Sequence, residues 1–190
     1  MLVQQIRNAT VKIVYQNKSI LIDPWLAPQY ALGSIAQMVP NVFKLQDKMK
    51  ANIPMPIAPL PMSVEDILRD VDAIIITHIH PDHVDMMPNG HIGECLPHDL
   101  PVFVQNDEDA SILRQNNFND VRVLSAQGTD FEGIAITKPH VVMEQLSLVV
   151  KLVAFVLRPL KSLSLWLVVI LFGIHSCKRH YVNIILRLYC

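Results

Sequence analysis

One short stretch constrains the fold of this chain more than any other: residues 72–77, Asp-Ala-Ile-Ile-Ile-Thr. Its four central side chains are consecutive apolar residues, and the run has the length of a strand without any alternation of apolar and polar positions. A strand that lacks a polar side is buried on both faces, as in the sheets of α/β proteins. The stretch therefore predicts a sheet that is covered on both sides.

Other segments predict strands and helices that alternate along the chain. Residues 9–15 alternate apolar and polar side chains, and the polar turn at 16–19 leads into residues 20–23, which predicts a β-hairpin. Pro24 ends the second strand because proline cannot donate a ladder hydrogen bond. Helices are expected at 63–70 and 107–116, and strands at 102–104, 121–124 and 133–137. This alternation indicates a layered α/β domain.

The segment from residue 25 to residue 62 is rich in proline and methionine and has weak periodicity. It predicts a long irregular insertion, with a short helix near residues 42–50. Loops of this length without regular structure are uncommon in compact domains, and those that occur often cover a functional site.

A dense polar cluster, Thr77-His78-Ile79-His80-Pro81-Asp82-His83, follows the apolar strand directly. With 8 histidines in 190 residues, such a pattern is expected by chance in roughly one chain in a thousand. Side chains two apart in extended backbone point the same way, so His78 and His80 can ligate one ion. Asp82 and His83, beyond the Pro81 turn, can reach a second ion. Imidazole and carboxylate ligands suit zinc, with manganese or iron as alternatives, whereas the competing interpretation is a set of surface-loop histidines.

Five further residues have side chains that could take a chemical role. Structural hydrogen bonding by Asp23 is slightly favoured over support of a metal ligand from behind. Asp85 is expected to cap a helix after the cluster, and His91 and His98, in a loop rich in Gly and Pro, are expected to be solvated. Cys95 has no basic partner close in sequence, which argues against a nucleophile.

Composition excludes some classes of protein. A net charge of -1 with 17% charged residues gives no reason to expect a nucleic-acid partner. Three cysteines that stand far apart, and an N-terminus unlike a secretory signal, predict a reduced, cytoplasmic protein. The charge is uneven, because residues 1–140 hold sixteen acidic and ten basic residues and the remaining fifty hold one acidic and six basic residues.

The cluster His78-x-His80-x-Asp82-His83 after an apolar strand resembles the signature of the metallo-β-lactamase superfamily. The surroundings are similar to a bacterial branch of metal-dependent hydrolases related to ascorbate-phosphate lactonase. The segments that carry this likeness are Ile-Arg-Asn-Ala-Thr at 6–10, Leu-Ile-Asp-Pro at 21–24, the apolar strand at 72–77 and Val-Phe-Val-Gln-Asn at 102–106. The likeness covers residues 1 to about 138.

The resemblance implies an α/β fold, the N-terminal half of an αββα sandwich. It also implies two divalent metal ions, with His78 and His80 on the first and Asp82 and His83 on the second. In such enzymes the metals activate a water that attacks a carbonyl or phosphoryl centre, and Asp82 would help to orient or deprotonate it. The implied substrate is a small molecule: an ester, a lactone or a phosphate-bearing compound.

The family pattern stops after residue 138. Members of the family continue with a histidine–glycine pair, then a Gly-Asp-Thr segment whose aspartate bridges the metals, then a last histidine. His140 lies near the right place but is followed by Val141 instead of glycine. We therefore divide the chain into an incomplete metallo-β-lactamase-like domain at 1–138 and an atypical apolar tail at 139–190, and we expect activity to be impaired by the loss of these ligands.

The genetic code offers an explanation for the tail. If one base were lost after the Lys138 codon, the other frame permits Thr-Pro-Cys-Arg-His-Gly-Thr across residues 138–145. The glycine is forced, since the codon of Met143 ends in G and that of Glu144 begins with GA. Across residues 159–174 the same frame permits a sequence that contains Gly-Asp-Thr. These two recoveries favour out-of-frame translation of residues 139–190, and the tail is expected to form helices that pack poorly and leave one sheet face uncovered.

The competing explanation is a membrane tail. Residues 146–157 and 163–174 are largely apolar, but each run has about twelve residues and a span needs about twenty. Arg158, Pro159 and Lys161 interrupt their union, so attachment through the tail is the less favoured interpretation. The alternative function is accordingly a non-catalytic membrane-associated or partner-binding protein.

Overall fold

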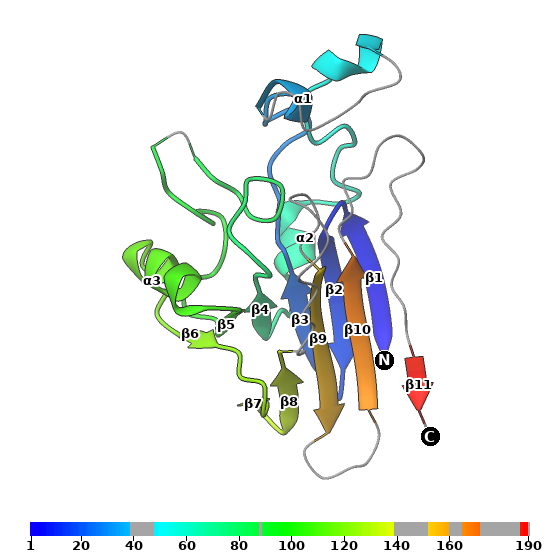
Figure 1. Cartoon of the computed structure of the whole chain (residues 1–190), viewed down its shortest axis with the longest axis vertical. Coiled ribbons are helices and arrows are strands. Elements are labelled where there is room, and N and C mark those ends of the chain that lie inside the picture. Colours follow the sequence, from blue (N-terminus) through cyan, green and yellow to red (C-terminus); the bar gives the residue numbers. More distant parts are fainter. Residues whose placement is uncertain (39–47, 88, 139–151, 160–164, 172–186, 190) are drawn as a thin grey trace.

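The computed structural model describes residues 1–38, 48–87, 89–138, 152–159, 165–171 and 187–189. Two sheets dominate this part of the chain, one with six strands in the order β1-β2-β3-β4-β5-β6 and one with five strands in the order β11-β10-β9-β8-β7. Figure 1 shows α3 beside β5 and β6, and α2 near the upper end of β3. The α/β fold class predicted from the alternation of elements is confirmed.

The first sheet begins as an antiparallel meander and continues as a parallel sheet. Its strands are β1 (Leu2–Arg7), β2 (Thr10–Tyr15), β3 (Lys18–Ile22), β4 (Ala73–Ile75), β5 (Val102–Val104) and β6 (Val121–Val123). The pairs β1·β2 and β2·β3 are antiparallel, whereas β3·β4, β4·β5 and β5·β6 are parallel. The predicted hairpin is confirmed as β2 and β3, with a turn that places Gln16 and Asn17 at positive φ.

The predicted apolar strand is confirmed as β4, although its regular part is shorter than residues 72–77. Backbone hydrogen bonds continue the ladder past both ends, from Asp72 N to Ser19 O at 2.8 Å and from Ile76 N to Phe103 O at 2.9 Å. Ile74 and Ile76 belong to one apolar cluster and Ala73 and Ile75 to another. Since side chains alternate between the faces of a strand, this division shows that both faces of β4 are covered.

Helices cover one face and the second sheet covers the other. The first cluster includes residues of α2 (Val64–Leu68) and α3 (Asp107–Gln115). The second cluster joins the first sheet to Phe131, Ile134 and Ile136 from β7 (Thr129–Phe131) and β8 (Ile134–Thr137). The expectation that one face of the first sheet lacks a partner layer is therefore wrong for the described residues.

The tail residues that the structure describes form strands. β9 (Leu152–Pro159), β10 (Leu165–Leu171) and β11 (Arg187–Tyr189) continue the second sheet from the edge of β8, all in antiparallel pairs. The expectation of helices is wrong for these three segments. Periodicity cannot separate a helix from a strand in a short run that is apolar throughout, and the open edge of β8 supplies backbone partners that the sequence alone does not show.

The insertion after β3 is irregular, as predicted. It contains α1 (Ile35–Met38) and a 3₁₀ helix at Lys48–Asn52, and an isolated bridge joins Leu32 to Met55. The short helix expected near 42–50 falls mostly on residues 39–47, which lie outside the described residues. Figure 1 shows α1 beyond the end of the first sheet, well away from the strands.

Candidate metal centre

The sequence places the cluster where the chain leaves the sheet. β3 ends at Ile22 and β4 at Ile75, and these two strands run parallel and in register from Ile20 with Ala73 to Ile22 with Ile75. The residues after both strands therefore meet at the same edge, where ligands commonly bind in α/β sheets. Asp23 from one strand end and residues 77–83 from the other are brought together in this way.

A tight turn folds the cluster back on itself. The backbone nitrogens of His83 and Val84 donate to the carbonyl oxygen of His80 at 3.0 and 3.1 Å, closing a turn around Pro81. The ring centroids of His78 and His80 are 4.5 Å apart, and those of His78 and His83 are 3.8 Å apart. The predicted convergence of the three imidazoles is present in the structure.

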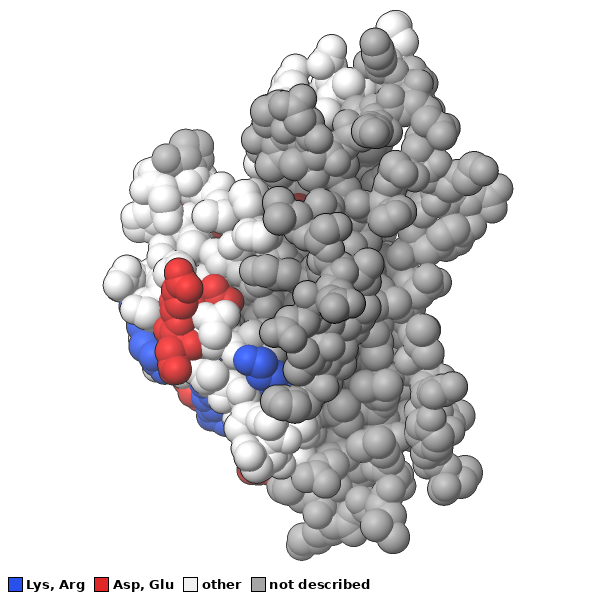
Figure 2. Space-filling model, in the orientation of Figure 1, with Lys and Arg blue, Asp and Glu red and all other residues white. Residues whose placement is uncertain are grey.

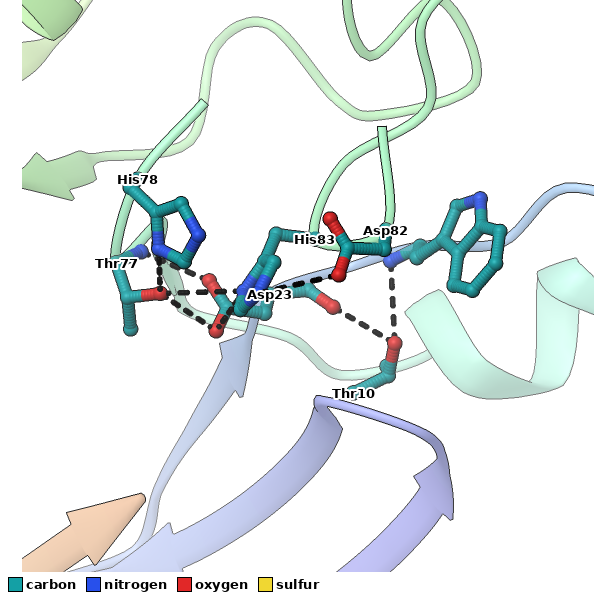
Figure 3. A network of polar contacts seen from close by, with 7 residues as sticks. Thr10, Asp23, Thr77, His78, Asp82 and His83 are labelled. Carbon is teal, nitrogen blue, oxygen red and sulfur yellow. Dashed lines mark hydrogen bonds and ion pairs between the residues drawn. The ribbon is translucent and has the colours of Figure 1, made fainter. Parts of the chain in front are cut away.

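The Asp23 carboxylate is bonded to two residues of the cluster. One carboxylate oxygen accepts the backbone N–H of Thr77 at 2.8 Å, and the other accepts the Thr77 hydroxyl at 2.8 Å and lies 2.9 Å from Nδ1 of His83. Asp23 is 0% exposed and His83 only 2%. Figure 3 shows this network, with Thr10 bonding to the carbonyl oxygen of Asp23 on the far side. Asp23 thus combines the two roles that the sequence left open: structural bonding and support of a cluster histidine.

The network gives Nδ1 a polar partner in two of the histidines. The Thr77 hydroxyl donates to Asp23, so its oxygen accepts from Nδ1 of His78, 3.1 Å away. A carboxylate without a proton only accepts hydrogen bonds, so Nδ1 of His83 is the donor to Asp23. In a neutral imidazole that donates through Nδ1, Nε2 is the nitrogen with the lone pair. This is the arrangement expected of metal-ligating histidines, whose second ring nitrogen usually donates to a carboxylate or another acceptor.

The spacing of Asp82 and His83 fits a shared ion. Nε2 of His83 lies 3.8 Å from a carboxylate oxygen of Asp82, whose side chain is 37% exposed. Two ligand atoms on one tetrahedral zinc are about 3.4 Å apart, given metal–ligand distances near 2.1 Å. The donor chemistry of these residues therefore fits a divalent ion. Among the described residues, however, no three His, Cys, Asp or Glu side chains already form a ligand group around one point.

Asp85 holds a neighbouring loop, and the predicted helix cap is wrong. Its buried carboxylate accepts the backbone N–H groups of Leu26 at 3.1 Å and Ala27 at 2.7 Å. Residues 81–87 form turns and a bridge instead of a helix, so there is no helix start to cap there. Arg7 binds the same loop through the carbonyl oxygens of Trp25 at 2.9 Å and Ala27 at 2.7 Å.

The remaining candidates have structural surroundings. Cys95 is exposed as a residue, yet desolvation of its thiol and the Asp85 carboxylate beside it raise its pKa to about 12, which agrees with the prediction that this thiol is not a nucleophile. His91 is exposed, as expected. His98 stacks on Phe118 with ring centroids 4.3 Å apart, so it is packed where solvation was expected.

Sequence reasoning missed Thr77 and Thr10 as parts of the site. Thr77 could have been found, because a hydroxyl at the end of an apolar strand and beside three histidines is a polar group that needs a buried partner. Thr10 gives no local signal, since its contact with Asp23 depends on the pairing of β2 with β3.

Together, the layered fold and the cluster define an α/β sandwich with three clustered histidines at the end of its parallel strands. A family model described as the metallo-beta-lactamase superfamily matches residues 7–84. Residues 7–84 of this chain therefore carry the sequence pattern of that superfamily.

Individual proteins resemble the chain over longer stretches. It is 37% identical over 136 residues to the UPF0173 protein YddR of Bacillus subtilis (strain 168), an alignment that covers 72% of this chain and 48% of that protein. A solved structure described as a possible metal-dependent hydrolase from Veillonella parvula DSM 2008 is 28% identical with a TM-score of 0.66, covering 88% of this chain and 60% of that one.

A third relative carries a named activity. The structure of isothiocyanate hydrolase from Delia radicum gut bacteria is 29% identical with a TM-score of 0.59, covering 83% of this chain and 58% of that chain. The chain thus spans about half the length of the curated relative and less than two thirds of these two solved structures.

Proposed function

We propose that this chain is a metal-dependent hydrolase of small molecules whose ions are held by His78, His80, Asp82 and His83. The observation that carries the proposal is the buried bond between Asp23 and Nδ1 of His83 at 2.9 Å, which orients an imidazole for a role at its other nitrogen. Zinc is the ion that suits this donor set best, with manganese and iron as the alternatives.

Each residue has a role in this chemistry. Divalent ions supply Lewis acidity and lower the pKa of a water molecule. Asp23 bonds to Nδ1 of His83 and Thr77 to Nδ1 of His78, so the two rings are oriented and would bind the ions through Nε2. Asp82 is partly exposed, and a carboxylate at the water-facing side of the site is placed to accept a proton from the attacking water.

The substrate class follows from the relatives and from the chemistry. The named neighbour hydrolyses an isothiocyanate, which is a small electrophile attacked by water at carbon. Transferred to this chain, that similarity supports hydrolysis of a small ester or lactone at a carbonyl carbon, while a phosphate-bearing substrate is the other member of the proposed class. The proposed partner is a small molecule and the proposed location is the cytoplasm.

Nucleic acid is not among the proposed partners. Figure 2 shows acidic and basic side chains next to one another on the described part of one face, without a broad basic area there. Affinity for nucleic acid depends on clustered Lys and Arg that neutralise phosphates.

The part of the chain that the structure describes contains no helix with the length and apolar character of a membrane span.

Metal titration tests the proposal. Isothermal titration of the chain with zinc, and separately with manganese, should show weak binding that His78→Ala reduces at least tenfold. The matched control is His91→Ala, since His91 is exposed and outside the cluster, and it should bind as the unaltered chain does. Equal zinc affinity in the two variants would contradict the proposed ligand set. Tight binding of two ions by the unaltered chain would contradict the proposal that ligands from the tail region are missing.

A further inference from the structure

A pocket lies beside the metal cluster, between the loop after β3 and the loop after the cluster. It has a volume of about 580 Å³ and is lined by Pro81, which stands between the candidate ligands His80 and Asp82. Pockets for small ligands usually measure about 300 to 1,000 Å³. The pocket is therefore large enough for a small molecule, and Pro81 is the lining residue next in sequence to the candidate ligands.

The wall of the pocket is held rigidly. Leu26 and Ala27, which line it, are bonded through their backbone nitrogens to Asp85, and Arg7 bonds to carbonyl oxygens of the same loop from the other side. Arg7 and Asp85 are 5% and 8% exposed. A loop fixed on both sides by buried charged groups keeps its shape without ligand, so the pocket is already formed.

The lining is apolar, and its charged groups are acidic. Its apolar side chains include Trp25, Leu26, Leu32, Val64, Met86 and Met87. Among the described lining residues the ionisable groups are Asp85, Glu94 and Cys95, and none is Lys, Arg or His. Arg7, behind the loop, interacts with the Asp85 charge, but the lining itself offers no cation to a phosphate or carboxylate ligand and exposes Glu94 to it. The apolar wall favours an uncharged group.

We propose that this pocket receives an uncharged apolar group of the substrate and disfavours an anionic one, so that the substrate is a neutral ester, lactone or comparable electrophile whose apolar part enters the pocket. The inference rests on the proposed hydrolase function, because it places the reacting centre at the cluster and the apolar group beyond Pro81. The charge and polarity of the pocket lining narrow the proposed substrate class to neutral molecules.

Two probes with the same apolar group test the inference. Trp25 lines the pocket, so W166F protein, in which Trp25 is the remaining tryptophan, reports binding by fluorescence quenching. Metal-free protein is titrated with 4-nitrobenzyl alcohol, which is neutral, and with 4-nitrobenzyl phosphate, which is anionic. The alcohol should bind at least tenfold more tightly. Equal or tighter binding of the phosphate would overturn the proposal.

Substitutions locate the binding in the pocket. Ala31→Phe fills it from an exposed position and should weaken binding of the alcohol about tenfold, while Ala58→Phe, at an exposed position that does not line it, should change binding less than twofold. If circular dichroism shows that the first variant is unfolded, Met87→Asp, at a side chain 43% exposed, replaces it with the same expectation. Unchanged affinity in the folded variant contradicts the inference.

The two proposals fail separately. Because the probes are tested without metal, alcohol binding in a chain that binds no zinc contradicts the hydrolase proposal and leaves the apolar pocket supported. Zinc binding that depends on His78, together with no preference for the alcohol, contradicts the pocket assignment alone.

Discussion

Asp23 joins parts of the chain that are far apart in sequence. Its carboxylate binds Thr77 and His83, and its carbonyl oxygen accepts the hydroxyl of Thr10. Its φ of 45° lies in the left-handed region, which Asp and Asn adopt more readily than other side-chain-bearing residues. This backbone turn sends the chain away from β3 while the carboxylate remains beneath the cluster, so conformation and bonding both depend on the residue type.

Replacing the Asp23 carboxylate should weaken metal binding more than it weakens the fold. In Asp23→Asn an amide oxygen can still accept the N–H of Thr77, but the charge beside His83 is lost. Loss of a hydrogen bond that supports a metal-binding histidine typically lowers metal affinity about 10- to 100-fold. We expect zinc titration to show a fall in affinity of that size. Asp107→Asn, at an exposed carboxylate of α3, is the control. Unchanged zinc affinity in the Asp23 variant would show that the bond does not support a ligand.

The sequence predicted the four cluster residues but only part of their surroundings. His78, His80, Asp82 and His83 could be proposed from spacing alone because a short motif fixes their order along the backbone. The contact between Asp23 and His83 spans 60 positions. It depends on the parallel pairing of β3 with β4, and no local sequence pattern predicts that pairing. Asp85 was assigned to a helix end for the same reason: its partners Leu26 and Ala27 are distant in sequence.

Helices and strands could be predicted from the sequence where apolar residues recur regularly and where a capping or turn residue marks the end of the element. Ser63 was predicted to open a helix, and its hydroxyl accepts the N–H of Asp66 at 3.0 Å at the start of α2. The sequence does not predict β1, because Leu2–Arg7 does not alternate apolar and polar side chains. The strand forms through its antiparallel backbone pairing with β2. β9 and β10 were missed because uniformly apolar runs carry no period.

The cap of α2 gives a prediction about stability. Ser63→Ala removes the acceptor for Asp66 N–H and should lower the free energy of unfolding by about 1 kcal/mol. Ser111→Ala is a matched control, because Ser111 is exposed within α3 and alanine is the better helix former there. Urea denaturation of both variants measures the difference. If both lose the same stability, the effect belongs to serine removal in general and the capping role is wrong.

For the molecule as a whole, the two sheets share one apolar layer. Phe103 of the first sheet meets Phe131 of the second with ring centroids 5.6 Å apart. The strands that contribute residues to this layer are β2, β3, β4, β5, β7 and β8. The alignment with the Bacillus protein spans 136 residues and 48% of that protein, a length close to that of the family-like segment at 1–138. The charge of the chain also changes beyond that segment, from acidic to basic.

We propose that this change reflects a shifted reading frame after Lys138, and sequencing the gene tests it. Restoring one base near that codon should open a frame that continues past Cys190 and encodes His-Gly, then Gly-Asp-Thr followed by Val or Ile and Trp, then a final histidine. The physical expectation follows from charge and ligand number. A third histidine and a bridging aspartate would complete two ion sites, since an incomplete ligand set neither fixes the ions nor lowers the pKa of a shared water. The repaired protein should therefore bind two zinc ions per chain and be more acidic and more soluble. A restored frame that meets stop codons at once, or that lacks the aspartate, would show that residues 139–190 are the native tail.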